Sequence, residues 1–406
     1  MEDPDANTDK RRDNRDCLVS RTARGVARWR HVTVLPFVAA QPLTDHHCHG
    51  VLRGDVSAPD LISLLDEGSP GSFDSLAGFS FLRWCPPVLD LDPHVPLGAY
   101  LARRAELGAD EVSRRFLGRA WLGALLVDTG FHAARLLTPA EMGAAAGAVS
   151  GEVVRLEAVA ESLAEVTVTA GGFADAYRAA LSARTTPTNR SVPVVAVKSI
   201  AAYRVGLDLA PSRPRDADVA AAAGRWLAAG AGRIAEEILH RFFIWCAADL
   251  GLPVQFHVGY GDRDVDLHRC NPLLLTPLLR ALEPSGIPVL LLHNYPYHRE
   301  AGYLAQVFPL VYADLGLATH NVGRRAVGLL AEALELIPFG KFLYSSDAFG
   351  LPELYYLGAL WFRRGLSSFL EQGIADGDWT QASAERLTRL ICVENARSVY
   401  RLLPLP

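Results

Sequence analysis

The stretch Asp45-His46-His47-Cys48-His49-Gly50 follows an apolar run, residues 32–43, that can feed a buried β-strand. Because strand side chains alternate between two faces, Asp45, His47 and His49 are expected on one face. His46 and Cys48 are then expected on the other face, pointing away from any site. Two imidazoles at a strand end suit a divalent metal such as zinc, which binds neutral histidine nitrogen. A solvated, histidine-rich turn is the alternative.

Composition narrows the class of protein. The chain has 406 residues, half of them hydrophobic, and a net charge of −5, so nothing favours nucleic acid or an anionic membrane as a partner. No apolar stretch approaches the length of a membrane span, about 20 residues. Six dispersed cysteines without a CxxC pair indicate reduced thiols in a cytoplasmic protein. Residues 1–30 are highly charged, lack a signal peptide, and are expected to be disordered or loosely packed.

Short apolar runs alternate with helical segments along the rest of the chain. This alternation indicates βαβ units and a parallel sheet, and eight such units favour a (β/α)8 TIM-type barrel. After the run that ends at 45–49, the expected strands are 121–127, 153–157, 192–197, 252–256, 287–292, 310–313 and 341–345. An open doubly wound sheet is the competitor, but no GxGxxG loop follows the first strand. We therefore expect one barrel over residues 31–406, with a helical insertion, 51–120, that forms a lid.

Polar residues end several of these runs. Lys198, His257 and His293 each follow an apolar run directly, and Asp347 follows its run after Ser346. The carboxyl ends of parallel barrel strands meet at one mouth, where catalytic residues of such barrels lie. A lone histidine usually has a hydrogen-bonding role, but this coincidence predicts a catalytic metal site. Such a metal lowers the pKa of bound water from about 15.7 towards about 7.

Two of these residues have distinct expected roles. Asp347 can bind the metal, accept a proton from water and pass it to a leaving amine. An ammonium group beside a dication is unfavourable, so Lys198 must be neutral, modified or turned towards the substrate.

Several longer stretches carry a specific family resemblance. Together with the Asp-x-His-x-His motif at residues 45–49, these stretches resemble the amidohydrolase superfamily, in its amidohydrolase-2 branch. It is similar in particular to the amidohydrolase domain of nodulin/FluG-type proteins. The similarity spans roughly residues 40–403, and its most specific stretches are 197–204, 256–262, 344–348 and 394–397.

The resemblance implies a ligand set and a cofactor. It makes His47, His49, His257 and Asp347 metal ligands, with Asp347 also the proton shuttle. His293 becomes a catalytic acid or a second-metal ligand. Lys198 joins the ligands if it is carboxylated or the centre is binuclear; otherwise it contacts the substrate. Zinc is the expected metal, with manganese and iron as alternatives, and one or two ions fit.

Substrate contacts are expected in the loops after the strands. Arg204 can grip a carboxylate through its planar fork, with a surface ion pair as the alternative. Asp262 lies in a glycine-rich loop, where a turn-forming role is equally open. Tyr203 follows Lys198, and Glu353 lies in the last loop.

Three functions compete at this stage. The resemblance favours a metal-dependent hydrolase of an amide or other C–N bond in a small molecule, with a γ-glutamyl amide as a candidate substrate. A non-oxidative decarboxylase on the same metal site is the first alternative. A non-catalytic, ligand-binding barrel is the second. Related barrels often form homodimers, which is an expectation for this chain also.

Overall fold

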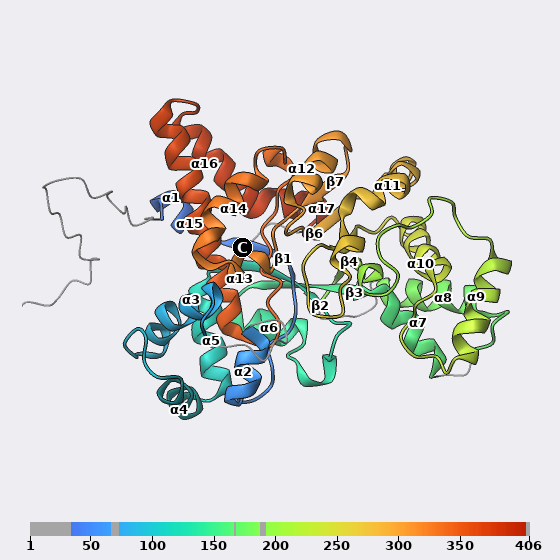
Figure 1. Cartoon of the computed structure of the whole chain (residues 1–406), viewed down its shortest axis with the longest axis horizontal. Helices are drawn as coiled ribbons and strands as arrows, with labels where there is room; N and C mark the ends of the chain where they lie inside the picture. The colour runs from blue at the N-terminus through green and yellow to red at the C-terminus, as the bar shows by residue number, and fades with distance from the viewer. Residues whose placement is uncertain (1–33, 66–72, 166–167, 187–191, 403–406) are drawn as a thin grey trace, which may run out of the picture. The chain divides into compact units, whose positions relative to one another are not determined.

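The computed structural model describes residues 34–65, 73–165, 168–186 and 192–402. Seven parallel strands form one sheet in which each strand neighbours the next in the chain (Figure 1). They are β1 (Leu43–Cys48), β2 (Leu122–Asp128), β3 (Val149–Arg155), β4 (Val194–Ser199), β5 (Val254–Val258), β6 (Val289–His293) and β7 (Val311–Ala313). The expectation for residues 1–30 lies outside the described residues.

The segment 342–347 joins the two edges of this sheet. Leu343 N donates to Ala313 O of β7 at 3.1 Å, and His46 N of β1 donates to Tyr344 O at 3.1 Å. Asp347 N donates to His47 O at 3.0 Å. The segment is extended but too irregular to be a strand, so the eighth strand expected at 341–345 is replaced by this bridging segment. The predicted α/β TIM-type fold is confirmed.

The sheet separates two apolar layers. The larger layer contains Leu125, Val127 and Val197 and lies between the sheet and the helices. The smaller contains the strand residues Leu126, Val153, Ala196, Leu290 and Leu292, with Leu343 of the closing segment and Ala396, Val399 and Tyr400. Because successive strand residues face opposite sides, the smaller layer is the barrel interior. Tyr400 belongs to the last helix, α17 (Asn395–Tyr400), so that helix packs into the barrel.

Strand β1 differs from the expectation in two ways. The apolar run before the motif does not extend the strand, because Pro36 starts a short helix, α1 (Pro36–Ala39), as proline favours the first turn of a helix. Asp45 pairs with Leu125 but Cys48 pairs with Val127, so β1 carries one extra residue, a β-bulge.

The bulge breaks the strict alternation of side chains along β1. His46 stacks on Tyr400 of the barrel interior, whereas Cys48 packs in the outer layer. The prediction that His46 and Cys48 share a face is therefore wrong, and Asp45 does not join the two site histidines but accepts hydrogen bonds from Ser346. Alternation assumes one residue per pairing step, which a bulge does not obey.

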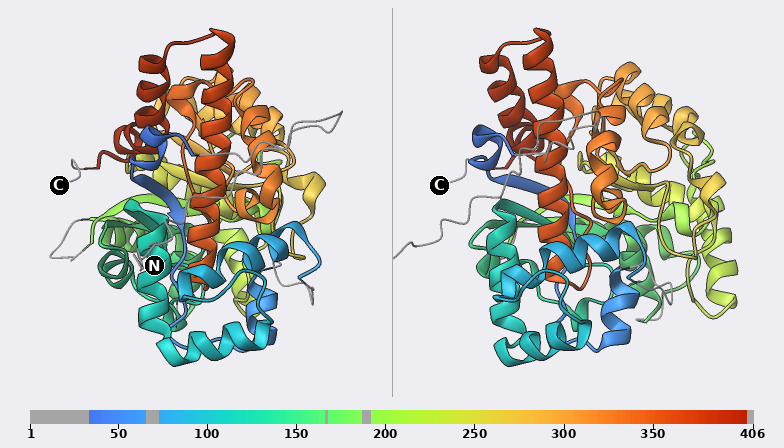
Figure 2. Two further views of the ribbon diagram at one scale, coloured as in Figure 1. Left: turned by 90° about the vertical axis from the view of Figure 1, so that its left-hand side faces the viewer. Right: turned by 60° about the vertical axis from the view of Figure 1, so that its left-hand side comes forward.

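The insertion between β1 and β2 is helical. Its helices are α2 (Ala58–Leu65), α3 (Leu76–Trp84), α4 (Leu97–Leu107) and α5 (Ala109–Ala120). The long helix α15 (Pro352–Asp376) contacts α3 and α5, and Figure 2 shows it running beside them. This packing connects the insertion to the segment that follows the last site residue.

The remaining helices connect successive strands or follow the barrel. They are α6 (Pro139–Ala146), α7 (Leu156–Ala164), α8 (Phe173–Thr185), α9 (Asp216–Ala228), α10 (Glu237–Asp249), α11 (Thr276–Leu282), α12 (His298–Val307), α13 (Ala318–Asn321), α14 (Ala326–Ala333) and α16 (Gln381–Arg389). The third expected strand, 153–157, is shifted, because Leu156 already begins α7. Among the described helices, none is both long and apolar enough to cross a bilayer.

Candidate metal centre

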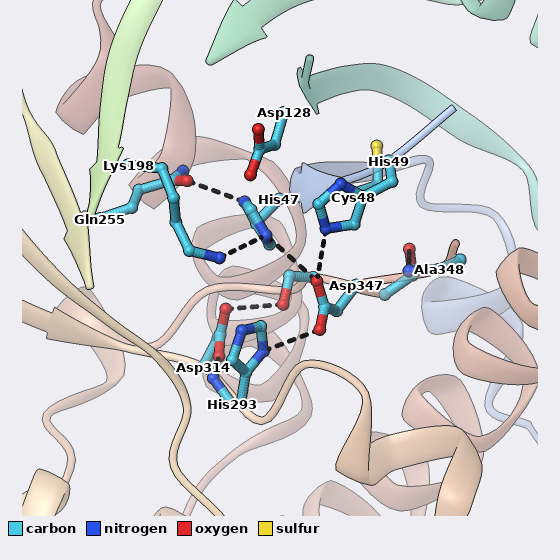
Figure 3. A network of polar contacts seen from close by, with 12 residues as sticks. His47, Cys48, His49, Asp128, Lys198, Gln255, His293, Asp314, Asp347 and Ala348 are labelled. Carbon is cyan, nitrogen blue, oxygen red and sulfur yellow. Dashed lines mark hydrogen bonds and ion pairs between the residues drawn. The ribbon is translucent and has the colours of Figure 1, made fainter. Parts of the chain in front are cut away.

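Asp347 lies at the middle of a cluster of histidines (Figure 3). Its Oδ1 lies 3.1 Å from His47 Nε2 and 3.4 Å from His49 Nε2, and its Oδ2 lies 3.3 Å from His293 Nδ1. His47 comes from β1, His49 from the position directly after it, His293 from the end of β6, and Asp347 from the closing segment. Closure of the barrel therefore brings residues 300 positions apart into one site.

Lys198 and His257 complete this group. Lys198 Nζ of β4 lies 3.0 Å from His47 Nε2. The ring of His257, from β5, lies with its centroid 4.5 Å from that of His293 and 4.4 Å from that of Tyr203. All six residues expected at strand ends thus lie at one mouth of the barrel.

These side chains fit a divalent metal ion. Ligand atoms of His47, His49 and Asp347 lie within 4.8 Å of one another. His257 Nε2 and His293 Nε2 are buried and have no hydrogen-bond partner among the described residues. Buried polar atoms are nearly always paired, so unpaired ring nitrogens beside a carboxylate fit a bound cation. Histidine nitrogen with carboxylate oxygen is the donor set of catalytic zinc sites.

The protonation states also suit a metal. Burial and, to a smaller extent, the neighbouring Lys198 lower the pKa of His47 to about 4. Burial likewise holds the pKa of His257 and His293 well below the ordinary value. Burial acts to raise the pKa of Asp347, but the neighbouring His293, His47 and His49 keep it well below its usual range. Neutral imidazoles and an ionised carboxylate are the forms that bind metal.

The backbone is strained at two of these residues. His293 has φ +72° and Asp347 has φ +49°, in the left-handed region that non-glycine residues rarely adopt. Hydrogen bonds hold both turns: Asp314 Oδ1 accepts from His293 N at 2.6 Å, and Asp314 Oδ2 accepts from Ser345 Oγ at 2.6 Å. Gly316 is required beside them, since a Cβ there would collide with His293 Nδ1.

A cavity of about 290 Å³ opens onto the metal cluster. Three of the four residues expected to contact substrate, Tyr203, Arg204 and Asp262, line it. Its wall also includes His49, Lys198, His257 and Asp347, with Ser63, Leu64, Phe131, Arg155, Ile200, Arg233, Asp264, Phe349 and Leu354. Ser63 and Leu64 belong to α2, so the insertion contributes to the wall.

Glu353 does not line this cavity. It is fully buried, and its Oε1 accepts hydrogen bonds from Arg104 Nε at 2.9 Å and from Tyr100 Oη at 2.8 Å. The structure therefore places it in an ion pair between α15 and α4, because the first turn of α15 directs it towards the insertion.

Sequence reasoning missed other residues around the site. Arg155 lines the cavity and pairs with Asp128 Oδ2 at 2.7 Å. Gln255 Oε1 lies 2.8 Å from His47 Nδ1. Gln255 precedes His257 by two residues on the same strand, so a polar residue in that register was the available signal. The sequence gives no such signal for Arg155, because its partner Asp128 lies on a different strand.

Comparisons with known proteins identify the family of this chain. A sequence model of the amidohydrolase family matches residues 127–402. The chain is 34% identical over 223 residues to protein fluG of Emericella nidulans, a match that covers 52% of this chain and 26% of fluG. The chain thus spans about a quarter of that relative.

Solved structures give the same result. A protein of Lactobacillus casei described as a metal-dependent hydrolase is 31% identical, with a TM-score of 0.79 over 90% of this chain and 96% of that one. A uronate isomerase of Bacillus halodurans is 14% identical, with a TM-score of 0.61 over 90% of this chain and 95% of that one, and shares the fold. The expected family resemblance is confirmed.

Proposed function

The chain belongs to the amidohydrolase family, and from that premise we propose that it is a metal-dependent hydrolase of an amide or related C–N bond in a small molecule. The observation that carries this proposal is the grouping of His47, His49 and Asp347 beside a cavity large enough for a small substrate, with His49 and Asp347 in the cavity wall. We propose zinc as the metal, since the donors are nitrogen and oxygen.

The roles of the residues follow from their positions. A divalent ion held by His47, His49 and Asp347, with His257 adjacent, would acidify water and polarise a carbonyl oxygen. Asp347 takes the proton from the attacking water and transfers it to the leaving amine. His293, fully buried beside Asp347, orients that carboxylate. Lys198 lines the cavity, and burial lowers its pKa, which suits a contact with substrate beside the ion.

Arg204 supports an anionic substrate such as a γ-glutamyl amide. Arg155 and Arg233 of the same cavity are already paired with Asp128 and Asp264. Arg204 makes only a 3.4 Å hydrogen bond to Tyr203 O, and its buried Nε has no hydrogen-bond partner within the described residues. A guanidinium that is not already paired with a carboxylate of the protein can hold a substrate carboxylate through two parallel hydrogen bonds.

The test is a panel of γ-glutamyl amines, with the corresponding amides that lack the α-carboxylate as controls. The zinc-loaded protein should release glutamate, and Arg204→Ala should raise KM for the carboxylate-bearing substrates alone. Carbon dioxide release without glutamate would instead identify the decarboxylase. Failure to turn over any amide, with the metal bound, would refute hydrolysis.

A further inference from the structure

Gln255 is a buried amide between the metal cluster and the barrel interior. Its side chain is fully buried on β5, and Oε1 lies 2.8 Å from His47 Nδ1 (Figure 3). His47 Nε2, on the other side of the ring, faces Asp347 Oδ1 at 3.1 Å. Gln255 thus contacts the ring nitrogen that does not face the site.

The hydrogen bonds of the amide allow one orientation. Gln255 Nε2 donates to the backbone oxygen of His46 at 2.9 Å and to Tyr400 Oη at 2.8 Å. A backbone oxygen can only accept, so the NH2 group must face it and Oε1 must face His47. An amide oxygen can only accept as well, so His47 Nδ1 carries the proton. Nε2 then carries a lone pair directed at the site, where Lys198 Nζ lies 3.0 Å away.

We propose that Gln255 is the positioning residue that holds His47 as the Nδ1–H tautomer and so presents Nε2 to the metal, and that Tyr400 of α17 secures this amide. The proposal rests on the metal centre of the proposed function. Partners of metal-bound histidines commonly set the tautomer and the ring orientation in this way.

Tyr400 connects this amide to a second support of the site. Burial raises the pKa of Tyr400 well above its ordinary value, so its hydroxyl keeps its proton. That hydroxyl accepts from Gln255 and donates to His46 Nδ1 at 2.8 Å. His46 Nε2 lies 2.8 Å from Asp314 Oδ2, and Asp314 holds the backbone of His293. The bulge in β1 makes this network possible, because it turns His46 into the barrel beside His47.

Zinc affinity, measured by competition with a chromophoric chelator, tests the proposal without any substrate. Gln255→Leu should weaken zinc binding by about 10- to 100-fold, the usual effect of removing such a partner. Tyr400→Phe should weaken it less, because the backbone oxygen of His46 still orients the amide. Tyr177→Phe is the matched control: it removes another buried hydroxyl, bonded to Leu156 O at 3.2 Å, and should leave affinity unchanged.

A spectroscopic measurement keeps the proposal testable if Gln255→Leu does not fold. In protein labelled with ¹⁵N-histidine, long-range ¹H–¹⁵N correlations should show His47 with a protonated Nδ1, assigned by its loss in His47→Gln. An Nε2–H tautomer, or wild-type affinity in folded Gln255→Leu, would overturn the proposal. Both readouts are independent of turnover, so an absence of amidase activity leaves them interpretable, and their failure leaves amide hydrolysis open.

Discussion

At the scale of single residues, Asp347 combines two tasks. One of its carboxylate oxygens faces His47 and His49, and the other faces His293. A carboxylate shared in this way can bind a metal through one oxygen and move a proton through the other. The two tasks are separable, because an amide keeps a metal-binding oxygen but cannot accept the proton.

Asp347→Asn should therefore keep most of the bound metal and lose turnover by about 10²- to 10⁴-fold, the range for a general acid–base group. Metal content by elemental analysis and kcat on the same preparation measure the two effects. The exposed Asp92→Asn is the matched control and should change neither. Full activity in Asp347→Asn would show that another group moves the proton.

His320 is a buried histidine that makes the free energy of unfolding depend on pH in the acid range. It lies in α13, and neither ring nitrogen has a hydrogen-bond partner within the described part of the chain. Burial lowers its pKa to about 4, from about 6.5 when unfolded. The unfolded chain therefore binds the proton more readily, so the contribution of the neutral ring is full above pH 6.5 and is lost as pH falls towards 4.

His320→Gln should remove roughly 2 kcal/mol of the stability that metal-free protein loses between pH 7 and pH 5. Urea unfolding at the two pH values measures this difference. Other buried histidines also make the wild-type protein less stable at pH 5 than at pH 7. Only the difference between the wild type and His320→Gln is therefore assigned to His320. The exposed His132→Gln should keep the wild-type slope, and an unchanged slope in His320→Gln would contradict the assignment.

At the scale of elements, the contact between α15 and α4 depends on one buried ion pair. Glu353, Arg104 and Tyr100 form a hydrogen-bonded group away from the cavity lining. Removing one partner of a buried pair leaves an uncompensated charge, which commonly costs about 3–5 kcal/mol. A substrate contact would show the opposite pattern, with an effect on KM and little on stability.

We accordingly expect Glu353→Gln to lower the free energy of unfolding by a few kcal/mol (about 3–5) while KM stays at the wild-type value. Denaturant unfolding and steady-state kinetics below the unfolding transition measure the two quantities. Glu371→Gln, exposed on the same helix, should stay within about 0.5 kcal/mol of wild type. A raised KM with unchanged stability would restore the substrate role for Glu353.

At the scale of the whole molecule, the proposed metal joins the first and last parts of the barrel. His47 lies on β1 and His49 directly follows it, whereas Asp347 lies in the segment that closes the barrel against β1. An ion bound to both would stabilise the closed form and not the unfolded chain. Binding of this kind raises stability by RT ln(1 + [L]/Kd), about 2.7 kcal/mol at 100 times Kd.

Removal of metal with a chelator should lower Tm, and added zinc should restore it in proportion to the logarithm of its concentration. Thermal unfolding across a zinc titration measures this. His47→Ala should abolish the zinc dependence while the metal-free Tm stays close to that of the chelated wild type. A wild-type Tm that does not change with zinc concentration would contradict the proposed metal site.

The sequence by itself determined the parallel barrel and the positions of its polar strand ends, because apolar runs and the residues after them are local features. Lys198, His257, His293 and Asp347 could be placed at one mouth from topology alone. The irregular closing segment, the bulge that turns His46 inwards, the pairing of Glu353 with Arg104, and the contact between Gln255 and His47 were decided only by the tertiary structure. Each depends on which distant residue lies opposite, through hydrogen bonds between segments up to about 350 positions apart, and such partners leave no mark in local sequence periodicity.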